Sequence, residues 1–152
     1  MKSQAVRDER RSIDTRFGRF VHHAGDEVAM VEPLAGFETC RRYILLSPPE
    51  IEPLVCLQGL EGEKPSFLAV APHVADPAFA CALSEKDAAR LGLGPRSGAV
   101  SPPLWLALVR VGPNDASANL RAPIVINPAR MVGLQVVPLS NDYSTEHQLP
   151  LG

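Results

Sequence analysis

Covalent chemistry by a thiol would have to use one of three cysteines, and Cys81 is the one with a histidine upstream and a helix start downstream. It lies eight residues after His73 and three residues before Ser84, where a short helix is expected to begin. A nucleophilic thiolate needs a base and a pKa lowered by a cation or a helix N-terminus. Cys56 lies in an apolar run and is expected in the core. Cys81 and His73 therefore define a thiol-enzyme hypothesis, which a Cys81 of ordinary reactivity and pKa would exclude.

Other catalytic and cofactor-binding patterns are missing from the sequence. It contains no GxSxG nucleophile elbow, no HExxH zinc motif and no glycine-rich loop with a phosphate-binding lysine. His22 and His23 are adjacent, so in a strand they face opposite sides and do not readily bind one metal together. Paired carboxylates such as Glu61 and Glu63 lie in turn segments, where side chains are usually solvated. We therefore predict a non-enzymatic protein without a metal or another cofactor.

The composition argues against two further classes of protein. The 152 residues are 45% hydrophobic and 21% charged, which is ordinary for one globular domain. The net charge is −2, and residues 17–152 alone carry a net charge of −4. An acidic body with 5% aromatic residues argues against direct nucleic-acid binding. The sequence has neither a membrane-spanning apolar run nor the apolar core of a signal peptide, and three cysteines without CxxC spacing fit a reduced, cytoplasmic environment.

Short β-rich segments separated by turns make up most of the chain. Residues 1–14 are charged and aperiodic, so we expect a flexible N-terminal arm, followed by one domain over residues 15–149. Strands are expected within residues 15–21, 27–31, 41–46, 54–60, 66–72, 104–111, 120–127 and 133–139. Seven or eight short strands, with too few helices for parallel crossovers, predict an antiparallel barrel or sandwich.

One segment, "SEKDAARLGLG", has the pattern of a short helix. Ser84 is placed to cap its N-terminus, and Asp87 three residues later imitates a capping box. Alanine and leucine favour helix in the middle of the segment, and Gly92 is placed to end it. We therefore expect one short helix inserted among the strands.

The stretch Ala118–Val137, "ANLRAPIVINPARMVGLQVV", has no acidic residue, histidine or cysteine, and it is expected to form two paired strands joined at "NPARMVG". Its two halves resemble the distinctive motif of the flagellar assembly factor FliW family. Four other segments resemble family motifs in the same order: "LAGFETCRRYILL", "PLVCLQGLEGEKPSFLAVAP", "LSEKDAARLGL" and "YSTEHQL". The resemblance covers Thr15 to Leu149. It implies a mostly β fold, a small antiparallel β-barrel-like domain with one short inserted helix.

The resemblance also implies a function. FliW proteins are cytoplasmic, non-enzymatic regulators that bind the translational repressor CsrA away from its RNA-binding surface and antagonise it allosterically. They also bind flagellin, and the two partners compete. The expected partners are therefore a CsrA-type repressor and flagellin, with no direct contact to nucleic acid or membrane. The alternative is a diverged module with the same fold and a different partner, because Met30, Pro33 and Phe79 replace the family's usual aromatic residue, glycine and tyrosine.

Seven residues of these motifs are candidates for partner binding: Phe37, Glu38, Gln58, Phe79, Asn119, Asn127 and Gln135. The first two lie in an expected loop and are the better interface candidates. The side-chain amides of the last three have a second, favoured interpretation, in which they bond buried strand ends or turns. Three residues are expected to set backbone geometry: Gly36, Pro72 and Pro123. Four are expected in the core: Leu57, Phe67, Trp105 and Ile124.

Overall fold

The computed structural model describes residues 4–94, 102–137 and 142–150. These residues form the strands β1 (Arg10–Thr15), β2 (Gly18–His23), β3 (Val28–Met30), β4 (Arg42–Leu46), β5 (Val55–Gly59), β6 (Ser66–Val70), β7 (Leu104–Val111), β8 (Ala116–Ala118), β9 (Ile124–Asn127), β10 (Val132–Gln135) and β11 (His147–Gln148). Helical segments are α1 (Gln4–Arg7), η1 (Ala24–Asp26), η2 (Pro49–Ile51), α2 (Pro72–Ala75) and α3 (Glu85–Leu91).

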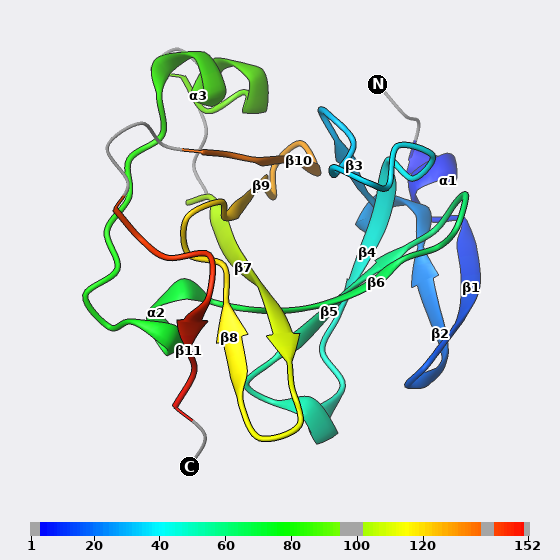
Figure 1. Ribbon diagram of the computed structural model, residues 1–152. Helices are drawn as coiled ribbons and strands as arrows, with labels where there is room; N and C mark the ends of the chain where they lie inside the picture. Colours follow the sequence, from blue (N-terminus) through cyan, green and yellow to red (C-terminus); the bar gives the residue numbers. More distant parts are fainter. Residues whose placement is uncertain (1–3, 95–101, 138–141, 151–152) are drawn as a thin grey trace.

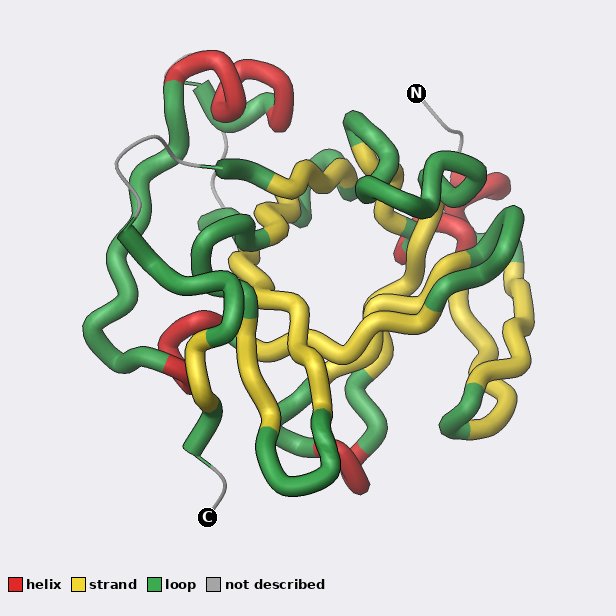
Figure 2. Tube along the Cα trace, in the orientation of Figure 1, coloured by secondary structure: helices red, strands yellow, loops and turns green. Residues whose placement is uncertain are grey.

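Seven of these strands close into a barrel. Their order is β7–β6–β5–β4–β3–β10–β9, and β9 pairs with β7 to complete the ring, which is seen end-on in Figure 1 and as the yellow ring of Figure 2. Neighbours are antiparallel except β3 and β10, which run parallel. An odd number of strands cannot alternate direction around a closed ring, so one parallel pair is unavoidable. The predicted β-barrel is confirmed, and the parallel pair is an addition to it.

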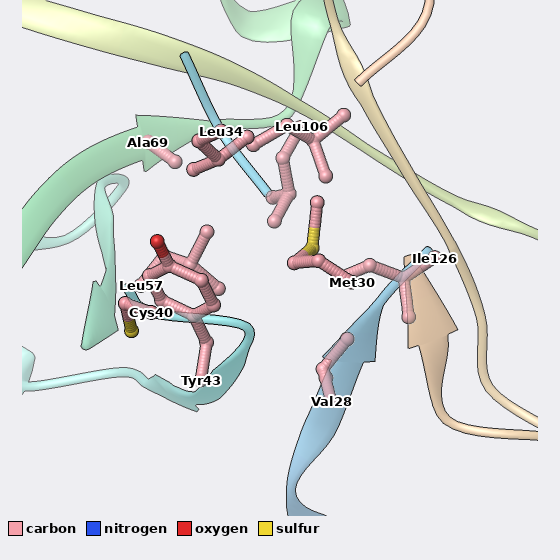
Figure 3. Close-up of a cluster of buried hydrophobic side chains, with 10 residues drawn as sticks. Val28, Met30, Leu34, Cys40, Tyr43, Leu57, Ala69, Leu106 and Ile126 are labelled. Carbon is pink, nitrogen blue, oxygen red and sulfur yellow. The ribbon is translucent and has the colours of Figure 1, made fainter. Parts of the chain in front are cut away.

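The interior of the barrel is filled by apolar side chains from most of its strands. Tyr43 and Leu57 are fully buried, and Figure 3 shows them in one cluster with Met30 and Leu106. Removing such side chains from water stabilises the fold by about 1.5–3 kcal/mol each. Of the four predicted core residues, Leu57 and Ile124 are fully buried. Phe67 and Trp105 are half-buried at the edge of the packed clusters.

The prediction of a flexible arm over residues 1–14 was wrong for most of residues 4–14, the part of the arm that the structure describes. Residues 10–14 belong to β1, which pairs with β2 along its whole length. The hairpin packs on a cluster that includes residues of β4 and β5, through Ile13, Phe17 and Phe20. Residues 1–3 lie outside the described residues.

The inserted helix is confirmed, with both of its predicted ends. The Ser84 hydroxyl accepts a hydrogen bond from the Asp87 N–H at 3.1 Å, and Gly92 ends α3 in the left-handed conformation. Several shorter elements were not predicted, namely α1, α2, β8 and β11. Strands β8 and β11 extend the sheet outward from β7, beyond the closed ring.

Candidate protein-binding surface

Phe37 lies in a tight turn within the loop between β3 and β4. Its N–H donates to the Leu34 carbonyl at 2.9 Å, and its carbonyl accepts from the Cys40 N–H at 3.1 Å. Gly36 has a φ of +88°, a conformation that glycine adopts without strain. The Gly36 N–H donates to the Glu38 carboxylate at 3.0 Å. The turn therefore presents a half-buried phenyl ring beside an exposed carboxylate.

The loop that follows β5 holds this turn in place. The Glu61 carboxylate accepts a hydrogen bond from the Arg41 N–H at 2.8 Å. Gly62 has a φ of +61° and lies against Thr39, so closely that a Cβ at Gly62 would stand 2.9 Å from the Thr39 carbonyl oxygen. Two loops that are separate in sequence are thereby fixed to each other.

Phe67 in β6 connects Phe37 to a shallow cleft. The two phenyl rings pack edge to face with centroids 5.0 Å apart. Phe67 also lines a cleft of about 360 Å³, together with Leu108, Val109, Arg110, Ser117, Asn119, Thr145 and Glu146. An ion pair of 3.6 Å joins two of the exposed lining side chains, Arg110 and Glu146. Of the predicted residues, Phe37 thus contacts Phe67, and Asn119 lines the same cleft as Phe67. We call Phe37, Glu38, Phe67 and the residues of this cleft the Phe37 surface.

Asn119 shapes the chain beside this cleft. Its Oδ1 accepts hydrogen bonds from the N–H groups of Arg121 at 3.1 Å and Ala122 at 3.0 Å, which form a turn before β9. The side chain is half-buried and lines the cleft. Asn119 therefore has a local structural role and also a place on the Phe37 surface.

Asn127 and Gln135 bond the backbone away from the cleft. Asn127 is 1% exposed; its Nδ2 donates to the Leu91 carbonyl at 2.7 Å, and its Oδ1 accepts from the Ala129 N–H at 3.0 Å. These bonds tie the end of α3 to the turn between β9 and β10. Gln135 donates to the Ala122 carbonyl at 3.1 Å. Both amides are placed as the structural interpretation expects.

Gln58 and Phe79 are also enclosed by the protein. Gln58 is 3% exposed and donates to the carbonyls of Gly59 and Lys64 at 3.1 and 3.3 Å. Phe79 is 7% exposed and packs against Tyr143, with ring centroids 4.9 Å apart. Neither residue lines the cleft of the Phe37 surface.

Comparisons with known proteins agree with this architecture. The family model for FliW protein matches residues 11–149. This chain belongs to the FliW family. It is 32% identical to the flagellar assembly factor FliW of Geotalea uraniireducens, covering 88% of this chain and 80% of the relative. It is 35% identical to that of Natranaerobius thermophilus, covering 76% of both. A crystal structure of the flagellar assembly factor FliW superposes with a TM-score of 0.80 at 25% identity, covering 90% of this chain and 95% of that one.

The FliW match begins at Arg11, within β1, so the matched region includes the β1–β2 hairpin. Two departures from the usual family pattern, Met30 and Phe79, are buried in separate hydrophobic clusters at 3% and 7% exposure. Pro33 is half-buried in the loop that carries Phe37. Met30 and Phe79 therefore take part in core packing rather than in an exposed face of this FliW protein.

Cys81 does not have the environment of an activated thiol. Burial raises the pKa of its thiol, whereas a nucleophilic cysteine needs a lowered one. The His73 ring instead packs edge to face against Phe79, with centroids 6.1 Å apart. Within the described residues, no three His, Cys, Asp or Glu side chains are grouped to hold a metal ion. None of the helices in the same ranges has the length and apolar character needed to cross a bilayer.

Sequence reasoning missed a buried carboxylate at the base of the hairpin. The Glu27 side chain is 2% exposed, and it bonds to Arg11 and His22, each at 2.9 Å, and to Arg42 at 3.3 Å. Burial alone would raise the pKa of Glu27, but the His22 hydrogen bond and the two arginines outweigh it, so the pKa is lowered. No motif marks this cluster, because its members come from three strands and one loop and Arg11 was assigned to the arm.

Proposed function

We propose that this FliW protein is a non-enzymatic, cytoplasmic regulator of flagellin production, which binds and allosterically antagonises a CsrA-type repressor and also binds flagellin. The observation that carries the proposal is the family match over residues 11–149, together with relatives named flagellar assembly factors. A regulator of this kind works through binding surfaces, so its chemistry consists of shape, apolar contacts and a few placed polar groups.

The Phe37 surface is the proposed partner-binding site. It offers an aromatic pair, Phe37 on Phe67, next to a cleft with both polar and apolar lining residues. Aromatic residues supply much of the energy of protein interfaces, especially when rigid neighbours hold them. The hydrogen bonds of the turn and the contact with the β5–β6 loop hold Phe37 in this way. The exposed Glu38 carboxylate adds a charge that suits a basic partner.

Regulation follows from the coupling of binding events. If this protein binds RNA-free CsrA more tightly than RNA-bound CsrA, it must weaken the binding of RNA by the same factor. Flagellin that occupies the same surface then releases CsrA to silence flagellin synthesis, and export of flagellin reverses the exchange.

The test is calorimetric titration of the full chain with CsrA and flagellin from the same cell, followed by a competition experiment. We expect micromolar or tighter binding of each partner and mutual exclusion. Phe37→Ala should weaken binding of at least one partner by about thirtyfold, the effect of losing a hot-spot residue. Phe17→Ala is the matched control, because it removes another half-buried phenyl ring, at the β1–β2 turn.

Two results would count against the proposal in different ways. If neither partner binds at micromolar concentrations, the function is wrong, and the diverged module with another partner becomes the better explanation. If both bind and Phe37→Ala behaves like the control, the function stands and the assigned surface is wrong.

A further inference from the structure

A second and larger cleft lies between α1, η1, β3 and the turn that precedes β10. Its volume is about 530 Å³, within the roughly 300–1,000 Å³ of typical ligand sites. The lining residues that matter here are Arg7, Arg42, Arg130, Ala29, Met131 and Val132. Residues of the Phe37 surface take no part in it.

The cleft has surplus positive charge on a protein whose body is acidic. Its one lining carboxylate, Glu27, is already held by Arg11 at 2.9 Å, by Arg42 at 3.3 Å and by His22. Among the described residues, neither Arg7 nor Arg130 is in an ion pair. Two guanidinium groups are therefore left to attract an anion.

Backbone contacts fix the positions of these two arginines. Gly25 allows α1 to lie close, because a Cβ at Gly25 would stand 3.1 Å from the Cβ of Arg7. The Arg130 guanidinium lies over the end of α3, where a Cβ at Gly92 would stand 2.7 Å from its Nη1. Both residues line the cleft, and they come from segments on different parts of the chain.

The wall between the charges is apolar and contains no aromatic residue. It is formed by Ala24, Ala29, Met131 and Val132. Single-stranded nucleic acids are usually held by aromatic stacking as well as by charge. Alternating carboxylate and apolar side chains fit this lining better. We infer that the cleft binds an acidic, partly apolar peptide segment of a protein partner. This inference does not depend on the proposed binding of CsrA or flagellin.

Fluorescence anisotropy with the full chain tests the inference. The probe is a short fluorescein-labelled peptide of alternating glutamate and leucine, and its control has glutamine in place of glutamate. We expect the glutamate peptide to bind, with an affinity that falls as salt is raised. The double variant Arg7→Gln, Arg130→Gln should bind about tenfold more weakly, since two exposed charge contacts are lost. Arg16→Gln, Lys86→Gln removes two exposed positive charges elsewhere and should leave binding unchanged.

A third variant separates loss of the site from loss of charge. Ala29→Glu keeps every arginine and places a competing carboxylate on the exposed face of β3, so it should weaken binding as well. Circular dichroism checks that each variant is folded. Equal binding of the glutamine peptide, or an equal loss in the Arg16, Lys86 control, would overturn the inference. Tighter binding of a single-stranded RNA oligonucleotide through the same arginines would overturn it as well.

Discussion

Replacing Asn127 by alanine distinguishes the two interpretations of this residue. Asn127 is 1% exposed and forms two hydrogen bonds, one to the Leu91 carbonyl and one from the Ala129 N–H. If it holds the fold, Asn127→Ala lowers the free energy of unfolding and leaves the affinity of the folded protein for partners unchanged. If it presents an amide to a partner, the affinity falls and the stability does not.

The structure allows the size of the effect to be worked out. Leu91 is fully buried, so its carbonyl loses its side-chain partner where water does not easily replace it, at a cost of about 1–3 kcal/mol. Ala129 is exposed, so its N–H can bond water, and that loss costs about 0.5 kcal/mol. With the packing of the truncated side chain, we expect about 3 kcal/mol in total. For a domain of this length, that lowers the Tm by about 6–12 °C.

Urea unfolding followed by tryptophan fluorescence measures this change. Trp105 is the single tryptophan, and it pairs with Val125 where β7 closes the barrel against β9. Asn114→Ala, in an exposed loop, is the matched control and should change stability by less than about 0.5 kcal/mol. Asn127→Asp keeps the acceptor for Ala129 and loses the donor to Leu91, so it should destabilise at least as much as alanine. A loss below about 1 kcal/mol for Asn127→Ala would refute the reasoning.

Two further predictions concern the hairpin and the Phe37 loop. Glu27→Gln should lower stability at pH 7 by about 2 kcal/mol, because Arg11 loses a buried partner. The pKa of Glu27 is lowered in the folded protein, so the extra stability of the wild type is present above the unfolded pKa of about 4.3 and is lost as the pH falls through the folded pKa. The difference in Tm between wild type and variant, measured from pH 7 to pH 3, should therefore decrease. A constant difference would contradict this. Gly62→Ala should cost about 2–3 kcal/mol in urea unfolding, because it adds a clash with Thr39 to backbone strain. Gly36 also has a positive φ, but a Cβ added there would have no neighbour within 4 Å, so Gly36→Ala should cost only about 1 kcal/mol. An equal cost for the two variants would show that the contact between residue 62 and Thr39 is unimportant.

The parts of the fold that could be predicted are those with a local cause. Strands β4 to β7 come from apolar runs bounded by proline and glycine, and α3 comes from the Ser84 cap and the Gly92 stop. The parts that could not be predicted have no such pattern. In β1 only Ile13 is buried, so the strand shows no clear alternation and looks like a charged arm. In β8 all three residues are buried, but they are alanine and serine, which resemble a loop.

The candidate site could be predicted only where one segment carries it. Phe37 and Glu38 follow a glycine in an expected loop, so the sequence alone makes them candidates. Their relation to Asn119 depends on Phe67, which contacts Phe37 and lines the same cleft as Asn119. The proximity of residues from different segments is set by the order of strands around the barrel and leaves no local pattern in the sequence. The same holds for Glu27, whose partners come from distant parts of the sequence.

The two clefts also bear on how competition between partners would arise. The Phe37 surface is built on the β3–β4 loop, β6, β7 and β8, whereas the arginine-lined cleft is built on α1, η1, β3, β4 and the turn before β10. The two clefts share no lining residue. A closed ring of hydrogen-bonded strands has little freedom to transmit a change by sliding, because every strand is held on both sides. The mutual exclusion that we propose for CsrA and flagellin is therefore more simply explained by overlap on one surface than by coupling between the two clefts.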